Sequence, residues 1–192
     1  MAAYTLKIAT NSSWTETVLA DFDRFLLDHA SCEKKASSMA MTFVSHYPDR
    51  IELVKAMTEL AVEELVHFKE VVKIILSRNL VLGADEKDPY VTRFFKSMRK
   101  GTDFYFLDRL LIASIIEARG HERFGLIAEA LEPGPLKQFY KAITVSEGRH
   151  LDLFTDLART YFPEPIVSER LEELLEIEKA IILDLPFRAA LH

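Results

Sequence analysis

Two stretches decide the predicted fold: AVEELVHFKEVVK at residues 61–73 and SEGRHL at residues 146–151. Each contains Glu-x-x-His, with Glu64 and His67 in the first and Glu147 and His150 in the second, 83 positions further on. Positions i and i+3 of a helix share a face, so each pair can reach one point beside its helix. One such pair carries little information. Because it occurs twice, other residues that recur at the same distance are candidates for the same site.

The sequence around both motifs predicts an all-α protein. Ser13-x-x-Glu16 has the form of a capping box and starts the first helix. Prolines and glycines separate the later segments, and apolar residues recur at three- and four-residue steps within them. The predicted helices cover residues 13–45, 49–79, 90–100, 103–131, 135–161 and 167–182. This order predicts one domain over residues 1–192, a ferritin-like four-helix bundle with one long crossover and an additional C-terminal helix.

Composition excludes several classes of protein. The chain has 192 residues, of which 49% are hydrophobic and 28% charged, so it can bury a core and is not of low complexity. Its only cysteine, Cys32, forms neither a disulfide nor a Cys-x-x-Cys metal motif, and we assign it no role. The N-terminal residues lack the apolar region of a secretory signal, and no apolar run is long enough to span a bilayer. We therefore expect a soluble cytoplasmic protein with no membrane partner.

The bundle architecture predicts a metal centre. A carboxylate site of this class takes one Glu from each of two helices and one Glu-x-x-His from each of the other two. Glu33 in the first predicted helix and Glu117, 84 residues later, repeat at nearly the spacing of the two motifs. The predicted ligands are Glu33, Glu64, His67, Glu117, Glu147 and His150. Oxygen and imidazole donors suit iron or manganese better than a thiolate-seeking metal.

The neighbours of the predicted ligands fit this interpretation. Small residues flank Glu33 (Ala30, Ala36, Ser37 and Ala40) and Glu117 (Ala113, Ser114 and Gly120), leaving room for metal and reactant. Two ferrous ions would neutralise four carboxylates whose burial without metal would be costly. Taken alone, any one of these Glu residues would be read as a solvated helix face, and His67 as a core histidine. Glu63 is next to Glu64, and we expect it to be exposed or to support the ligands. His121 lies one turn after Glu117, and we expect a supporting or structural role for it.

The chain resembles a known family, the bacterial tRNA 2-methylthio-N6-isopentenyl-adenosine hydroxylases. The resemblance covers nearly the whole chain and rests on LLDHASCEKKASSMA, ELAVEELVHFKEV, LLIASIIEARGHERF and SEGRHLDLF. It implies a non-haem di-iron monooxygenase that uses dioxygen to hydroxylate the isopentenyl group in the tRNA anticodon loop. It also implies that Glu64 and Glu147 bridge the irons while Glu33 and Glu117 each bind one. With no flavin or nicotinamide motif in the chain, we expect a separate reductase or ferredoxin as the electron donor.

The stretch KDPYVTRFFKSMRKGTDFYF at residues 87–106 is the first candidate for tRNA contact, because basic and aromatic residues alternate there. The possible contact residues are Arg93, Lys96, Arg99 and Lys100, although aromatics on an amphipathic helix are commonly core. A second set lies near the ligands and is expected to point mostly outward: Lys34, Lys35, Arg119, Arg123 and Arg149.

Other functions use the same ligand pattern. A ferritin-like ferroxidase or iron-storage protein needs it too, but requires a shell-forming oligomer and no basic-aromatic crossover. A rubrerythrin-like peroxidase is disfavoured by the missing cysteine cluster. A helical adaptor without metal would leave the four Glu residues unexplained.

Overall fold

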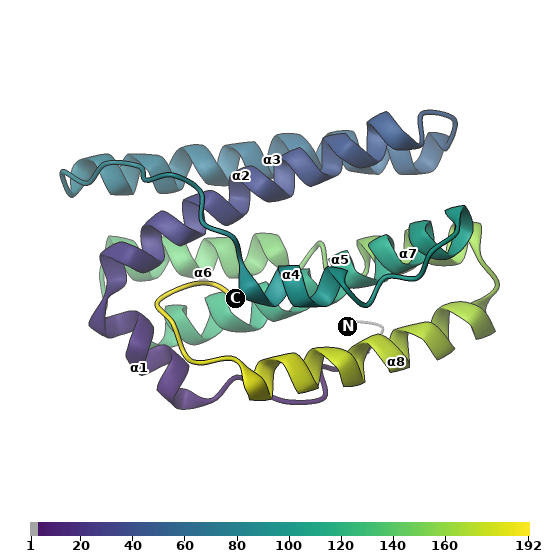
Figure 1. The fold of residues 1–192 in the computed structure, drawn as a ribbon. Coiled ribbons are helices and arrows are strands. Elements are labelled where there is room, and N and C mark those ends of the chain that lie inside the picture. Colours follow the sequence, from purple (N-terminus) through teal and green to yellow (C-terminus); the bar gives the residue numbers. More distant parts are fainter. Residues whose placement is uncertain (1–3) are drawn as a thin grey trace. The chain divides into compact units, whose positions relative to one another are not determined.

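The structure is a computed structural model that describes residues 4–192. Within that range every regular element is a helix (Figure 1). By their internal contacts the described residues form two compact units. Residues 16–86 and 188–191 form the α2–α3 unit, and residues 4–15, 87–187 and 192 form the α4–α8 unit. The single domain expected from the sequence stays a prediction.

The α2–α3 unit is a helical hairpin. Helices α2 (Phe22–His46) and α3 (Ile51–Ser77) lie side by side and antiparallel (Figure 1). Small residues allow close approach, and the Ser37 hydroxyl donates to the Ala61 carbonyl across the pair at 2.8 Å. The core of this hairpin consists of Phe25, Leu26, Ala30, Ala40, Phe43, Leu53, Met57, Leu60, Val71 and Ile75. After α3, Asn79 takes φ +58°, and the amide of Leu80 donates to the Ile75 carbonyl, as at helix ends closed by a left-handed residue.

The α4–α8 unit is built around one long buried helix. Its helices are α4 (Pro89–Phe95), α5 (Thr102–Ala130), α6 (Pro135–Glu147), α7 (Leu153–Tyr161) and α8 (Glu164–Asp184). Helix α5 packs against α6, α7 and α8, and α8 also packs against α4. Asp88 caps α4 by accepting from the amide of Tyr90 at 2.8 Å, and Pro89 occupies the first turn. Gly101 precedes α5 at φ +102°, a conformation that favours glycine.

The prediction of one continuous helix over residues 13–45 is wrong. The chain instead forms α1 (Ser12–Ala20) and α2, separated at Asp21. Asp21 leaves the helical region, and its carboxylate accepts from the amide of Arg24, so it caps α2. The predicted capping box does not start α1 either, because Asn11 accepts from the amide of Ser13 there.

The fifth predicted helix, residues 135–161, is also interrupted. Residues 148–152 form turns between α6 and α7. The amides of Arg149 and His150 donate to the carbonyls three residues earlier, Ser146 and Glu147, both at 2.9 Å. Gly148, a poor helix former, sits where the spacing of the hydrogen bonds changes. The break therefore falls inside the second Glu-x-x-His motif.

None of the described helices is long and apolar enough to cross a membrane.

Candidate metal centre

The α2–α3 unit gathers three of the predicted ligands. Glu33 lies on α2, and Glu64 and His67 lie on successive turns of α3. His67 Nδ1 lies 3.5 Å from Glu64 Oε2 and 3.7 Å from Glu33 Oε2. All three side chains are buried, and each offers a donor atom within 4.8 Å of the others. They form the first half-site.

His29 supports this half-site and was missed by the sequence analysis. It is fully buried one turn before Glu33 on α2, and its Nε2 lies 2.6 Å from Glu33 Oε1. One carboxylate oxygen of Glu33 is thus engaged by His29 while the other faces His67. The spacing of four residues between His29 and Glu33 on one helix could have indicated this contact from the sequence.

The α4–α8 unit gathers the other three. Glu117 lies on α5, Glu147 is the last residue of α6, and His150 follows in the turns. Residues three apart eclipse one another in a tightened turn, and His150 Nδ1 lies 3.3 Å from Glu147 Oε2. Glu147 and His150 are buried and Glu117 is half-buried, again with donor atoms within 4.8 Å of one another. They form the second half-site.

Two neighbours shape the second half-site. The half-buried His121, one turn after Glu117, lies with Nδ1 3.0 Å from the Thr144 carbonyl of α6, so its role here is structural. The buried Ser114, one turn before Glu117, lies with Oγ 2.9 Å from the hydroxyl of Tyr4. Burial raises the pKa of Tyr4, so this phenol is neutral at physiological pH. An N-terminal residue therefore packs next to the ligand-bearing face of α5.

The donor set fits a pair of iron ions. Each half-site offers two carboxylates and one imidazole, the ligands that ferrous iron and manganese take in proteins. The only thiol is half-buried, and Cys32 Sγ lies 3.7 Å from Asp28 Oδ2, a carboxylate outside either half-site. Grouping buried carboxylates is unfavourable unless positive charge compensates them, which a divalent cation does.

The residues predicted for tRNA contact differ in their surroundings. Lys96 and Lys100 are exposed, as is Arg93, which pairs with Asp184. Of the aromatics in this stretch, Phe95, Phe104 and Tyr105 are exposed, while Tyr90, Phe94 and Phe106 are core. The predicted contact with tRNA stays a prediction.

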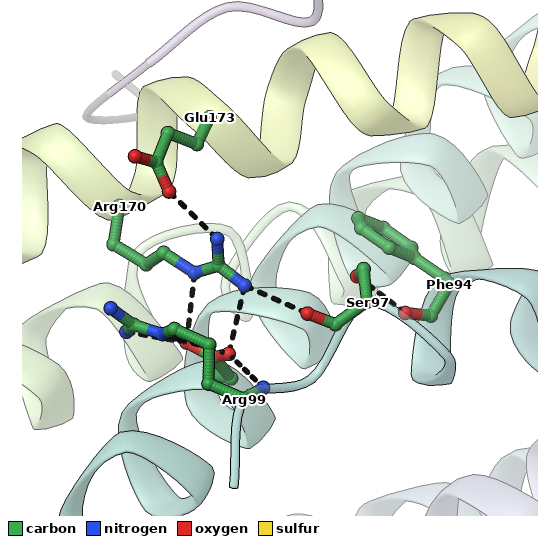
Figure 2. Close-up of polar contacts among 6 residues, drawn as sticks. Phe94, Ser97, Arg99, Arg170 and Glu173 are labelled. Atoms are coloured by element: carbon green, nitrogen blue, oxygen red, sulfur yellow. Dashed lines mark hydrogen bonds and ion pairs between the residues drawn. The ribbon is translucent and has the colours of Figure 1, made fainter.

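Arg99 is part of a buried ionic cluster shown in Figure 2. Arg99 and Arg170 both hydrogen bond to the carboxylate of Asp108, which is inaccessible to solvent. Arg170 also donates to Glu173 and to the Ser97 carbonyl. Burial alone would raise the pKa of Asp108, but the hydrogen bonds from Arg170 and Arg99 lower it below its ordinary value.

The expectation that the arginines near the ligands point mostly outward is wrong for two of them. Arg119 is fully buried and binds Glu178 of α8 through Nε at 2.8 Å and Nη2 at 3.0 Å. Arg123 is buried with its guanidinium 4.8 Å from the centre of the Trp14 ring. Helix α8 and the N-terminal segment cover this face of α5. The position of a residue around one helix does not show whether other segments pack over it, so the sequence could not predict this burial. Lys35 and Arg149 are exposed as expected.

Comparison with known proteins places this site in a family. The family model described as tRNA-(MS2IO6A)-hydroxylase (MiaE) matches residues 2–192. The tRNA 2-(methylsulfanyl)-N(6)-isopentenyladenosine(37) hydroxylase of Pseudomonas putida is 31% identical over 173 residues, which are 90% of this chain and 84% of that protein. The protein of the same name from Salmonella typhimurium is 31% identical over 156 residues, 81% of this chain. The chain spans 57% of that Salmonella protein's length.

A solved structure is also similar. Protein 43 with aldehyde deformylating oxygenase activity, from Synechococcus, matches with a TM-score of 0.89 and 34% sequence identity. The match covers 96% of this chain and 92% of the Synechococcus chain. It confirms the predicted ferritin-like, all-α fold class. With the family model matching nearly every residue, the chain belongs to the MiaE family of tRNA hydroxylases.

Proposed function

We propose that this protein is a di-iron monooxygenase that hydroxylates the isopentenyl group of 2-methylthio-N6-isopentenyl-adenosine in the tRNA anticodon loop. The observation that carries the proposal is the pair of half-sites, each with one Glu and one Glu-x-x-His. Family membership supplies the substrate, since two relatives 31% identical to this chain are named for it. The proposed ligands of the two irons are Glu33, Glu64, His67, Glu117, Glu147 and His150.

The side chains of the protein would hold the ions and keep water away. When bound, the irons supply the dioxygen chemistry that the amino acids lack. The four carboxylates balance the charge of two ferrous ions, and His29 keeps Glu33 in one orientation. Ala30 and Ala113 are buried small residues, one turn before Glu33 and Glu117, so no large side chain stands at these positions beside the proposed ligands.

The reaction also requires a partner. Insertion of one oxygen atom from dioxygen into a C–H bond consumes two electrons and two protons, and the second oxygen leaves as water. The chain carries no flavin or nicotinamide motif. We therefore propose a separate reductase or ferredoxin as the electron donor.

The direct test uses iron-loaded protein, a reductant, dioxygen and tRNA carrying the isopentenylated base. The nucleosides are then released and analysed by mass spectrometry. We expect the modified nucleoside to gain one oxygen atom, and Glu147→Ala to abolish the gain because it removes a proposed ligand. Glu132→Ala, which changes an exposed glutamate in a loop, is the matched control and should retain activity. Unchanged nucleosides from protein that has bound iron would refute the assignment.

A second candidate activity is favoured by the similar Synechococcus protein, whose name includes aldehyde deformylating oxygenase activity. The same iron-loaded protein can be given an aldehyde, and formate can be measured. Formate production without tRNA oxidation would assign the chain to that reaction instead.

A further inference from the structure

The α2–α3 unit contains a pocket outside the candidate metal centre. Its volume is about 140 Å³, and charged groups of both signs line it, together with apolar side chains. The basic residues are Arg24 and Lys34 of α2 and Arg188 of the segment after α8. The acidic residues are Asp28, Asp85 and Glu86, and the apolar ones include Leu27, Phe68 and Leu82.

Acidic residues of the segment that follows α3 occupy the basic side of this pocket. Lys34 Nζ lies 2.8 Å from Asp85 Oδ1, which also accepts from the Ser31 hydroxyl at 2.9 Å. Arg24 Nη2 lies 3.5 Å from Glu86 Oε2, and Lys35 donates to the Glu86 carbonyl at 2.8 Å. The hydrogen bonds from Lys34 and Ser31 lower the pKa of Asp85, so its carboxylate is charged at neutral pH. Asp85 and Glu86 thus place anionic groups against a row of cations on one face of α2.

These ion pairs are open to exchange. The side chains of Lys34 and Asp85 are 44% and 43% exposed, and those of Arg24 and Glu86 are 59% and 71% exposed. Exposed ion pairs contribute little to stability, so replacing one anion by another costs little. Residues 81–86 are all exposed and non-helical, and a Cβ at Gly83 would meet nothing within 4 Å. This segment has room to move away from α2.

We propose that this pocket binds backbone phosphates of the tRNA, with Asp85 and Glu86 occupying the phosphate positions until RNA replaces them. Arginine and lysine contacts to phosphate supply most of the affinity of proteins for nucleic acids, and a serine hydroxyl adds a further donor. Phe68 and Leu27 give an apolar surface for an adjacent sugar or base. The inference rests on the proposed tRNA substrate and adds a contact surface distinct from residues 87–106.

The first experiment removes the cations. Binding of a synthetic anticodon stem-loop RNA is measured by fluorescence anisotropy over a range of salt concentrations, without iron or reductant. Arg24→Gln with Lys34→Gln should weaken binding at least tenfold and reduce the slope of log affinity against log salt by about 0.8 for each lost phosphate contact. The charge-preserving Arg24→Lys with Lys34→Arg should bind close to wild type, and Lys73→Gln on α3 is the control.

The second experiment removes the competing anions and predicts the opposite sign. Asp85→Asn with Glu86→Gln should bind the RNA several-fold more tightly, because the cations become available. Glu172→Gln with Glu176→Gln removes two exposed acids from α8 and controls for net charge alone. A loss of folding cannot produce tighter binding, so this variant stays informative if the first one is unstable.

Three results would overturn the proposal. One is RNA affinity that stays the same in both pocket variants; another is equal tightening by the α8 control. The third is that inorganic phosphate competes with the labelled RNA as effectively as unlabelled RNA does when both are added at the same total charge. That result would assign the pocket to a free anion. Unchanged RNA affinity with a loss of reductase-supported turnover would instead assign the basic residues to an acidic electron donor. Binding is measured without catalysis, so failure of the hydroxylation assay leaves this test intact.

Discussion

At the scale of single residues, the two half-sites have the same types of proposed ligand but different residues supporting them. Glu33 is held by the fully buried His29, whereas position 113, at the matching distance from Glu117, is alanine. Near Glu117 the polar neighbours are Ser114 and the phenol of Tyr4. Hydrogen bonds behind a ligand fix its orientation, and their loss typically lowers metal affinity by about 10- to 100-fold. The two metal positions are therefore expected to differ in affinity.

Replacing His29 by alanine should weaken metal binding at the first half-site. We expect about a tenfold loss of affinity, because Glu33 would lose the contact at 2.6 Å that orients it. Titration with cobalt, followed by its absorption spectrum, measures the affinity without turnover. His46→Ala, at the exposed end of the same helix, is the control. Unaltered cobalt affinity in His29→Ala would show that Glu33 needs no such support.

At the scale of elements, buried ionic contacts join helices of the α4–α8 unit. The carboxylate of Asp108 on α5 accepts hydrogen bonds from Arg170 of α8 and from Arg99 of the segment before α5. Arg119 of α5 binds Glu178 of α8, and the Tyr90 hydroxyl of α4 donates to the same carboxylate at 3.2 Å. Breaking a buried pair on one side leaves a charge uncompensated, so these contacts fix which faces of α5 and α8 meet.

Asp108 should make the stability of this unit depend on pH. Its pKa is lower in the folded than in the unfolded protein, so its contribution is complete above about pH 4 and is lost as pH falls through the folded value. Asp108→Asn should cost about 3 kcal/mol at pH 7, because Arg170 would lose its buried partner, and less at pH 3. Urea unfolding at both pH values measures the difference.

The control for this prediction is Asp184→Asn. Asp184 pairs with Arg93 at the surface, where its side chain is 71% exposed, and its loss should leave stability unchanged. A penalty for Asp108→Asn that is the same at both pH values would contradict the role given to its ionisation.

At the scale of the whole molecule, the proposed iron ligands are divided equally between the two compact units. Neither half-site has more than three of the six ligands. A cation that binds only the folded chain stabilises it by mass action, by about 2.7 kcal/mol at a concentration 100 times its dissociation constant. Loss of a proposed ligand from either unit should therefore reduce the stabilisation by iron.

Ferrous iron added without oxygen should raise the thermal unfolding midpoint of the wild-type protein. Glu33→Ala and Glu117→Ala, one in each unit, should both reduce this rise, because each removes a proposed iron ligand. Differential scanning calorimetry with and without iron measures the shift. A full rise in either variant would mean that one half-site binds iron without the other.

The grouping of the proposed ligands within each half-site could be predicted from the sequence because it depends largely on local geometry. Glu-x-x-His places two donors on one helix face whatever the rest of the chain does, and the repeat of 83 or 84 residues pairs each motif with a further Glu. The helical class follows equally from local signals: composition, apolar periodicity, and Pro and Gly at the breaks. Even the second motif keeps its pairing through the turns at residues 148–152, since a tightened turn also brings residues three apart together.

The remaining features depend on contacts between residues distant in sequence, and only the tertiary structure decided them. Arg119 and Arg123 are buried because α8 and the N-terminal segment cover α5, and the partner of Arg119 lies 59 residues away. The pocket of Arg24 and Lys34 exists because residues 85 and 86 fold back onto α2, more than 50 positions away. Spacing along one helix determines which side chains share a face. Packing with other segments determines whether that face meets solvent, an opposite charge or a ligand.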